Sequence, residues 1–335
     1  MDFFKNKRIL ITGGTGSFGN AFCEYLIKSK SKVKKLIIYS RDEFKQSEMQ
    51  KKFPASRFPF IRFFIGDVRD KERLGRAMEY IDYVIHAAAL KHVTSGEYNP
   101  MEVIKTNIIG AQNIVETCLD HKVKNIIALS TDKASSPINL YGATKLCSDK
   151  IFIAANNIKG KRNTKFSVVR YGNVLGSRGS VLPIFLNSFR KKEDFTITDK
   201  KMTRFNITLN EGIKYVDWCF QNNLGGEIFI PKLYSFNILD LARAVNSKCK
   251  FKNIGVRPGE KLHEELISRS DSLNSAEGKN FYVILNNFER GDIEKYCKIK
   301  KLKKVTPDFE YLSNTNKNFL SVESIRKILK RDKFI

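Results

Sequence analysis

The sequence predicts an α/β fold in which a doubly wound parallel sheet carries a smaller, irregular C-terminal domain. Short apolar segments alternate with helical segments through the first half of the 335 residues, and this alternation predicts parallel strands joined by helical crossovers. The first apolar segment runs directly into a glycine-rich turn, as in many such sheets. After about residue 170 the alternation gives way to shorter pieces. A chain of this length forms one large domain or two closely joined domains.

The elements of the first half follow in order. Arg8–Thr12 is predicted to be a buried strand, and Phe18–Lys28 the helix after it. Lys35–Tyr39 is the next strand and Glu43–Lys52 the next helix. The series continues with three further strands, Phe60–Ile65, Tyr83–Ala87 and Asn125–Ser130.

In the second half, two segments are strand-like, Phe229–Pro231 and Asn253–Val256. They are mixed with short helices and loops, and no internal repeat accompanies them. Because ligands of open α/β sheets bind at the carboxyl ends of the strands, we expect the irregular domain to pack there.

Composition favours a globular protein that does not enter a membrane. Hydrophobic residues make up 42% of the chain and charged residues 28%, which is an ordinary globular balance. No apolar run approaches the roughly 18 residues that a membrane-spanning helix needs, and the N-terminus lacks a signal-peptide pattern. The six cysteines have no CxxC spacing. We therefore expect reduced thiols in a cytoplasmic protein, without a disulfide framework or a metal site.

The formal net charge of +25 is the unusual bulk feature. Nucleic-acid binding is one interpretation of such a charge. The other is a lysine-rich surface on a protein whose ligands are polyanions. Lysines are spread along the whole chain, with no arginine-rich tract or recognition helix. The second interpretation is favoured, and no nucleic-acid partner is expected.

A glycine-rich turn follows the first predicted strand. Gly13, Gly16 and Gly19 stand at the spacing GxxGxxG, where a strand ends and a helix begins. Glycine lets the backbone turn tightly and approach a pyrophosphate, whose charge the helix N-terminus stabilises. The pattern resembles the TGxxGxxG turn of the extended short-chain dehydrogenases/reductases, which have a Rossmann-type sheet. The predicted cofactor-binding residues of this turn are Thr12, Gly13, Thr15, Gly16, Ser17, Phe18 and Gly19.

The end of the second predicted strand favours NADP over NAD. An NAD site places an acid at this strand tip, whereas Ser40 and Arg41 offer a hydroxyl and a guanidinium suited to a 2′-phosphate. Asp42 is the counterargument, because it could itself reach the ribose. The prediction is NADP. By resemblance to the same superfamily, further cofactor-binding residues are predicted at Asp67, Val68, Ala87, Ala88, Ala89, Lys91 and Asn107.

Tyr141 and Lys145 form the pattern Tyr-x-x-x-Lys. On a helix, positions i and i+4 share a face, so the ammonium lies beside the phenol and should lower its pKa from about 10. A phenolate can remove a hydroxyl proton while hydride leaves the same carbon. The alternative is a structural tyrosine with a surface lysine. The position after a glycine turn, with Thr131 ending the intervening strand, favours the catalytic interpretation.

An acid and a base follow that strand end, in Thr131-Asp132-Lys133-Ala134. A simple dehydrogenase or 4-epimerase needs only the hydroxyl of Thr131. An acid beside a base is what β-elimination of water requires, once a ketone has acidified the neighbouring C–H bond. The alternative is an exposed ion pair in a loop. The tyrosine and lysine nearby favour elimination.

These segments together resemble the inverting UDP-N-acetylglucosamine 4,6-dehydratases, which open pseudaminic acid biosynthesis. The resemblance extends from about residue 8 to residue 270 and leaves the last 60 or so residues unmatched. It implies a first domain over residues 1–170 that binds NADP and carries the catalytic Tyr and Lys. It also implies a UDP-sugar domain over 171–275, with some segments returning to the sheet. Residues 276–335 form an extension to which no role is given.

The resemblance implies a role for each site residue. Tyr141 deprotonates the 4-hydroxyl of the sugar, and Lys145 holds Tyr141 and the nicotinamide ribose. Asp132 protonates the departing C6 hydroxyl and Lys133 takes the C5 proton, for which neighbouring cations should keep it a neutral amine. NADP is regenerated in each turnover, and a homo-oligomer is expected. The implied UDP-sugar ligands are Lys91, Asn173, Val181, Arg204, Arg257 and Glu260.

Two stretches depart from the family pattern, Thr94-Ser95-Gly96 and Asn206. They leave the exact sugar and the C5 stereochemistry open. The rivals are a configuration-retaining dehydratase, a UDP-N-acetylglucosamine 4-epimerase and, from another class, a nucleotide-binding or RNA-binding protein without catalysis. Because the retaining relatives have methionine at the position of Tyr141, the tyrosine favours the inverting branch.

Overall fold

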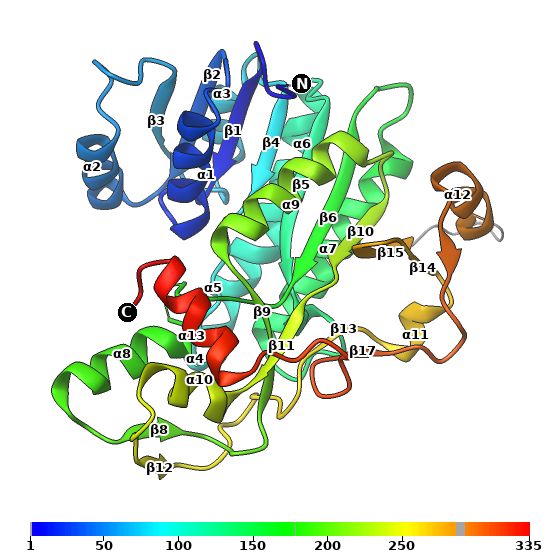
Figure 1. The fold of residues 1–335 in the computed structure, drawn as a ribbon. Helices are drawn as coiled ribbons and strands as arrows, with labels where there is room; N and C mark the ends of the chain where they lie inside the picture. Colours follow the sequence, from blue (N-terminus) through cyan, green and yellow to red (C-terminus); the bar gives the residue numbers. More distant parts are fainter. Residues whose placement is uncertain (1, 178, 286–291) are drawn as a thin grey trace.

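The computed structural model describes residues 2–177, 179–285 and 292–335, and it is organised around one large twisted sheet (Figure 1). This sheet has ten strands in the order β16-β14-β15-β10-β6-β5-β4-β1-β2-β3. Its parallel part consists of β3 (Ile61–Ile65), β2 (Lys35–Ser40), β1 (Arg8–Thr12), β4 (Tyr83–His86), β5 (Asn125–Thr131), β6 (Lys165–Tyr171) and β10 (Glu227–Pro231).

Helices cover both faces of the parallel strands. On one face, α1 (Ser17–Lys28) packs against α9 (Leu209–Asn222). On the other, α6 (Gly110–Asp120) lies between α3 (Lys71–Met78) and α7 (Leu140–Ile158), and α2 (Glu43–Lys52) lies at the β3 edge (Figure 1). The α/β, doubly wound prediction is confirmed.

Burial explains why these segments form central strands. Ile9, Leu10 and Ile11 of β1 are fully buried, and a near-continuous apolar run is typical of a strand that is covered on both faces. The five strands predicted in the first half agree with the observed ones to within a residue at each end, whereas β10 begins two residues before the predicted Phe229. In particular, β5 ends at Thr131, so Asp132 and Lys133 lie in a short 3₁₀ turn (Asp132–Ala134) at the carboxyl edge.

The second half builds smaller elements below the sheet in the view of Figure 1. A three-stranded sheet has the strand order β11 (Tyr234–Asn237), β9 (Thr203–Ile207) and β7 (Asn173–Val174). A separate two-stranded sheet pairs β8 (Phe195–Ile197) with β12 (Phe251–Asn253). With α8 (Val181–Lys191), α10 (Ile238–Val245) and α13 (Val322–Arg331), they enclose a second hydrophobic core that contains Phe185, Leu241 and Leu329.

One predicted strand in this region was misplaced. The expected strand over 253–256 shares only Asn253 with β12, which begins at Phe251. Gly255 has a positive φ of 78°, which ends the extended run.

The last residues return to both cores. β15 (Phe281–Leu285) pairs antiparallel with β10, followed by β14 (Ser275–Glu277) and β16 (Lys303–Lys304). Further along, β17 (Tyr311–Leu312) pairs with β13 (Glu265–Ile267). The short helix α11 (Arg269–Ser272) precedes β14, and α12 (Asp292–Lys300) precedes β16. The proposed boundaries at 170 and 275 stay predictions, and residues 286–291 of the predicted extension lie outside the described ranges.

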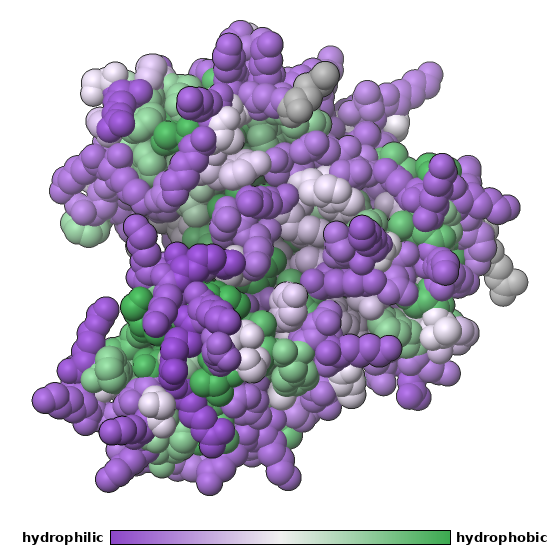
Figure 2. All heavy atoms as spheres, viewed as in Figure 1, coloured by the Kyte–Doolittle hydropathy of each residue, from purple (hydrophilic) through white to green (hydrophobic). Residues whose placement is uncertain are grey.

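The surface is mostly hydrophilic on the face drawn in Figure 2, with hydrophobic residues in smaller groups. Such a face agrees with the many lysines of the chain. In the part of the chain that the structure describes, no helix has the length and apolar character to cross a bilayer.

Candidate active site

A cavity of about 600 Å³ lies at the carboxyl ends of the parallel strands, where open α/β sheets bind their ligands. It is lined by the glycine turn, by the ends of β2, β4 and β5, and by the start of α7. Most of the residues predicted from the sequence line it: Gly13, Thr15, Gly16, Ser17, Phe18, Ser40, Arg41, Asp42, Asp67, Val68, Ala87, Ala88, Ala89, Lys91, Thr131, Asp132, Lys133, Tyr141, Lys145 and Asn173.

Seven predicted residues do not line this cavity: Thr12, Gly19, Asn107, Val181, Arg204, Arg257 and Glu260. Arg257 is exposed, and Val181 is the first residue of α8. Arg204 is buried and pairs with Glu260, with Nη2 and Oε1 3.4 Å apart. The structure therefore brings the catalytic residues and most of the cofactor residues together, while four of the six predicted sugar ligands are not among the residues that line the cavity.

Close approach of backbone segments explains the glycine turn. Gly13 has a positive φ of 63°, and a Cβ there would lie 2.8 Å from the Cα of Ala88. A Cβ on Gly19 would overlap the carbonyl of Gly14. Any side chain at Gly13 would collide with the backbone of Ala87 and Ala88, so glycine lets the turn pack directly against the end of β4.

Thr12 lies under the turn and bonds a buried histidine. Its Oγ1 is 2.8 Å from Nδ1 of His86. Burial lowers the pKa of His86 to about 3, assisted by the positive charge of Lys145. The imidazole is therefore neutral at physiological pH, and it supports the cofactor cavity from below without adding charge.

The tip of β2 is organised by hydroxyl and carboxylate contacts. Ser40 Oγ lies 2.9 Å from Thr15 Oγ1. Arg41 is half exposed, with Nη1 3.4 Å from Oδ2 of Asp67. Asp42 is the N-cap of α2 and accepts a hydrogen bond of 2.9 Å from the backbone of Lys45. The carboxylate of Asp42 is thus engaged by its own helix, and Arg41 lines the cavity.

Asn107 acts on the cavity wall from behind. Its Oδ1 accepts a hydrogen bond of 2.8 Å from the Leu90 N–H, and its Nδ2 donates to the Leu90 carbonyl at 2.9 Å. The same Nδ2 donates to Thr144 Oγ1 at 3.0 Å. These bonds connect the stretch before Lys91 to α7 and so fix the two cavity walls relative to each other.

Tyr141 and Lys145 share a face of α7, which begins at the N-cap Asn139. Burial raises the pKa of Tyr141 to about 12, although the charge of Lys133 and a hydrogen bond with Thr131 act against the rise. Lys145 donates to the Leu129 carbonyl at 2.9 Å, and burial lowers its pKa against the charge of Asp149. The expected lowering of the Tyr141 pKa is wrong for this structure, because loss of solvent outweighs nearby cations.

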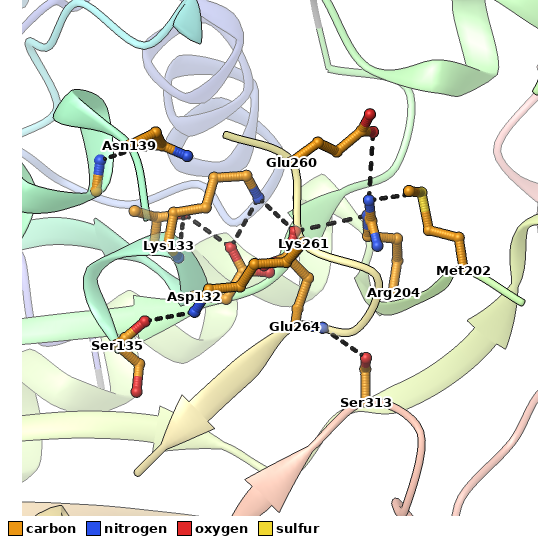
Figure 3. Close-up of polar contacts among 12 residues, drawn as sticks. Asp132, Lys133, Ser135, Asn139, Met202, Arg204, Glu260, Lys261, Glu264 and Ser313 are labelled. Atoms are coloured by element: carbon orange, nitrogen blue, oxygen red, sulfur yellow. Dashed lines mark hydrogen bonds and ion pairs between the residues drawn. The ribbon is translucent and has the colours of Figure 1, made fainter. Parts of the chain in front are cut away.

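Lys133 lies between two buried carboxylates, as Figure 3 shows. Its Nζ is 3.0 Å from Oδ1 of Asp132 and 3.0 Å from Oε1 of Glu264. Thr131 Oγ1 donates to the same Asp132 oxygen at 2.9 Å. The other oxygen of Asp132, Oδ2, is buried and has no hydrogen-bond partner among the described residues. A ligand hydroxyl in the cavity could satisfy it.

This arrangement shifts the pKa of each partner. Burial and the charge of Glu264 raise the pKa of Asp132, against the pull of Lys133. Burial disfavours the Lys133 ammonium, but the carboxylates of Asp132 and Glu264 outweigh burial and raise its pKa. Burial and the charge of Lys133 lower the pKa of Lys91. The expectation of a neutral Lys133 is therefore wrong for the protein alone, because the carboxylates of Asp132 and of Glu264, which was not foreseen, outweigh the neighbouring cations.

Glu264 is the residue that sequence reasoning missed. It stands in the segment Arg257-Pro258-Gly259-Glu260-Lys261-Leu262-His263-Glu264, where only the first and fourth residues were assigned a role. The family resemblance covers this segment, and Glu264 is an acid in it to which no partner had been assigned. The described residues contain no group of three or more His, Cys, Asp and Glu side chains that could hold a metal.

Comparisons with known proteins agree with this geometry. The sequence model of a family described as polysaccharide biosynthesis protein matches residues 9–286. The chain is 52% identical over 331 residues to a UDP-N-acetylglucosamine 4,6-dehydratase (inverting) of Campylobacter jejuni, with 97% of this chain and 98% of that relative covered. It is 40% identical over 332 residues to a UDP-glucose 4-epimerase of Rickettsia bellii, covering 97% and 96%.

Two solved structures extend the comparison. Pen from Bacillus thuringiensis is similar over 99% of this chain and 100% of its own, with a TM-score of 0.89 and 36% identity. DesIV, a dTDP-glucose 4,6-dehydratase from Streptomyces venezuelae with NAD and TYD bound, covers 76% and 86% with a TM-score of 0.69. At 20% identity, DesIV shows that the fold is shared.

Proposed function

The chain belongs to the polysaccharide biosynthesis protein family, and from this premise we propose that it is an inverting UDP-N-acetylglucosamine 4,6-dehydratase. The product is UDP-2-acetamido-2,6-dideoxy-β-L-arabino-hexos-4-ulose, formed as the first step of pseudaminic acid-type sugar biosynthesis. The observation that carries the proposal is the acid–base pair of Asp132 and Lys133 on the cavity wall, 3.0 Å apart, next to Tyr141.

The reaction needs a nicotinamide dinucleotide, and the cavity fits one. The glycine turn at Gly13 and Gly16, the small residues Ala87–Ala89 and the helix N-terminus at Ser17 line the part of the cavity that would hold it. When bound, this cofactor accepts a hydride from C4 of the sugar and later returns it to C6. Lys145 and Tyr141 hold its ribose in the proposed arrangement, and Tyr141 takes the proton of the 4-hydroxyl.

Elimination follows at the adjacent carbons. The C4 ketone acidifies the C5–H bond, so a lysine amine can remove that proton. Lys133 serves as this base. Asp132 donates a proton to the C6 hydroxyl, which leaves as water. The raised pKa of Asp132, due to burial and to Glu264, suits an acid that must hold its proton near neutrality.

We propose NADP as the cofactor. Ser40 and Arg41 can bind a 2′-phosphate. Asp42 lines the same cavity, but its carboxylate is engaged in capping α2, which supports NADP over NAD. A homo-oligomer, a cytoplasmic location and the sugar-ligand roles of Lys91, Asn173, Val181, Arg204, Arg257 and Glu260 remain predictions from the family.

A 4-epimerase is the second candidate, because the Rickettsia bellii relative carries that name. An epimerase would use Thr131, Tyr141 and Lys145 and would have no use for an acid and a base at C5 and C6. The buried position of Asp132 and the contact of Lys133 with two carboxylates favour the dehydratase.

Incubation of the purified protein with UDP-N-acetylglucosamine in deuterated water distinguishes these functions. A dehydratase forms a product that lacks one water, carries deuterium at C5 and shows a C4 ketone by NMR. An epimerase product keeps its mass, and a protein without catalysis forms no product. Unchanged mass of the sugar after prolonged incubation with NADP would contradict the proposal.

A further inference from the structure

We propose that Glu264 is a positioning residue of the elimination step, whose carboxylate fixes the Nζ of Lys133 on the cavity wall opposite Asp132. The inference rests on the proposed function, because it assigns Glu264 a part in that reaction. Four features support it: the contact with Lys133, the cation behind Glu264, the backbone bonds that place it, and the chemistry of the step.

The contact is tight and buried. Lys133 Nζ lies 3.0 Å from Glu264 Oε1 and 3.0 Å from Asp132 Oδ1, and the two carboxylate side chains are 2% and 1% exposed. A buried carboxylate is costly unless it is paired. Glu264 Oε2 has no hydrogen-bond partner in the described part of the chain. Its pairing is therefore concentrated on Oε1, the oxygen that meets Lys133.

Arg204 holds the other side of that oxygen. Its Nε is 3.5 Å from Glu264 Oε1. Its Nη1 donates to the carbonyls of Thr203 at 2.7 Å and Leu262 at 3.1 Å, so the guanidinium is itself fixed. Figure 3 shows Arg204 between Glu264 and Glu260. Two cations and two carboxylates thus alternate from the cavity wall into the protein, in the order Asp132, Lys133, Glu264 and Arg204. Arg204 therefore supports the site from behind, although it does not line the cavity.

The C-terminal segment places the backbone of Glu264. The Glu264 N–H donates to Ser313 Oγ at 2.9 Å, and the Ser313 N–H donates to the Glu264 carbonyl at 2.8 Å. Ser313 follows β17, which pairs with β13 directly after Glu264. Part of the extension that sequence analysis left without a role thus positions Glu264.

The chemistry of the step requires a fixed amine. In the elimination, Asp132 gives a proton to the C6 hydroxyl and the C6–O bond breaks to release water. The electrons of the C5–H bond form the C5–C6 double bond, and Lys133 takes that proton. In the protein alone the proton that this pair shares lies on Lys133. It must pass to Asp132 across their 3.0 Å contact before the step, and the step ends with the carboxylate and the ammonium. Glu264 lies where the ammonium forms, and its negative charge stabilises it.

Several charged groups act on Lys133, and a test must change only one of them. They are Asp132, Glu264, Arg204, Lys91 and Tyr141, with Lys261 and Glu260 acting on the neighbouring carboxylate and guanidinium. Glu264→Gln removes one negative charge and preserves shape. Glu265→Gln is the matched control, because Glu265 is also buried but bonds Ser135 Oγ at 2.9 Å.

The first measurement needs no substrate. Trace acetic anhydride labels only neutral amines, and mass spectrometry of peptides reads the labelling of Lys133 relative to exposed Lys28. Because Glu264 holds the proton on Lys133, Glu264→Gln should label about threefold to tenfold faster at a fixed mildly alkaline pH. Glu265→Gln should label like wild type. Equal labelling of Lys133 in wild type and Glu264→Gln would overturn the inference.

The second measurement follows the reaction. Glu264→Gln should lower kcat for dehydration about tenfold or more, because misplacing a reacting group is costly, and should accumulate reduced nicotinamide. KM for the UDP-sugar should stay close to wild type, and Glu265→Gln should keep both constants. A Glu264→Gln enzyme that dehydrates at the wild-type rate also overturns the inference.

If Glu264→Gln does not fold, Glu264→Asp replaces it, since aspartate keeps the charge but withdraws it by one methylene. It should show the same loss of kcat with a smaller rise in labelling, and wild-type values for both would contradict the proposal. Failure of the proposed function has a different signature. Wild-type protein would then form no dehydrated product, while the labelling result would still report on the ion pair.

Discussion

Lys133 and Glu264 lie 131 positions apart in the chain and meet with Nζ and Oε1 3.0 Å apart. The contact joins the carboxyl edge of the parallel sheet to the segment before β13. It sets the charge of the catalytic lysine, because two carboxylates raise its pKa above the ordinary value. The acid–base chemistry at C5 therefore depends on both halves of the chain.

Replacement of Lys133 separates hydride transfer from elimination. In Lys133→Ala, C4 oxidation should proceed while dehydration falls about 100-fold or more, the range for loss of a general base. The near-ultraviolet absorbance of reduced nicotinamide should then accumulate. Asp132→Asn should behave in the same way. Lys28→Ala, which removes a lysine with 79% side-chain exposure on α1, is the control. Near-wild-type dehydration in either catalytic variant would make the acid–base assignment wrong.

Arg41 should discriminate between the two nicotinamide cofactors. Arg41→Ala should weaken NADP(H) binding by about 1.5–3 kcal/mol, as expected for a lost charged hydrogen bond. The lower end is expected, because half of the side chain is exposed. Binding of NAD, which lacks the 2′-phosphate, is the internal control and should change little. Isothermal titration measures both, and an equal loss for the two cofactors argues against a 2′-phosphate contact.

His86 should make the fold sensitive to acid. Its pKa is lowered to about 3 in the folded protein by burial and by Lys145, against about 6.5 in the unfolded chain. The neutral imidazole is therefore compatible with the fold above about pH 6.5, and stability is lost as the pH falls towards 3. Between pH 7 and pH 5 the loss from this group should be about 2 kcal/mol.

Denaturant unfolding at these two pH values checks the prediction. His86→Asn should lose less stability than wild type on acidification, whatever its stability at pH 7. His121→Asn, at the end of α6, is the matched substitution elsewhere. Identical acid sensitivity in wild type and His86→Asn would exclude this histidine as the cause.

Ser313, in the C-terminal segment, should contribute to the free energy of unfolding. It is fully buried, and its Oγ accepts the Glu264 N–H. Ser313→Ala leaves that N–H without its partner, which should reduce the free energy of unfolding by about 1–3 kcal/mol. Ser270→Ala, on the exposed turn of α11, should change it little. Chemical denaturation measures both, and equal stabilities would show that the Glu264 backbone does not depend on this bond.

Local sequence patterns were sufficient for the sheet and for one side of the site. Apolar runs covered by helices predicted the parallel strands, and GxxGxxG predicted the turn at Gly13. Thr131 ends β5, which places Asp132 and Lys133 at the cavity beside Tyr141. These relations depend on neighbours in the chain and on the known edge of a parallel sheet.

Long-range contacts were not predictable in the same way. Glu264 precedes β13, which is placed by its pairing with β17, and no sequence pattern in either segment predicts that pairing. Burial raises the pKa of Tyr141. The pKa of Lys133 is raised against burial by Asp132, its neighbour in the chain, and by Glu264, which only the fold brings close. Within the described residues after 275, β15 joins the sheet at β10 through non-local pairing.

The stereochemistry at C5 tests the central claim most directly. The intermediate after elimination is planar at C5, so protonation from the face opposite Lys133 gives inversion, and return of the proton by Lys133 gives retention. Wild-type protein with UDP-N-acetylglucosamine and NADP should yield the L-arabino 4-ketone. Proton coupling constants at C5, recorded by NMR in the first minutes before slow epimerisation in solvent, identify it. A D-xylo ketone, or a UDP-sugar that has lost no water, would contradict the assignment as an inverting 4,6-dehydratase.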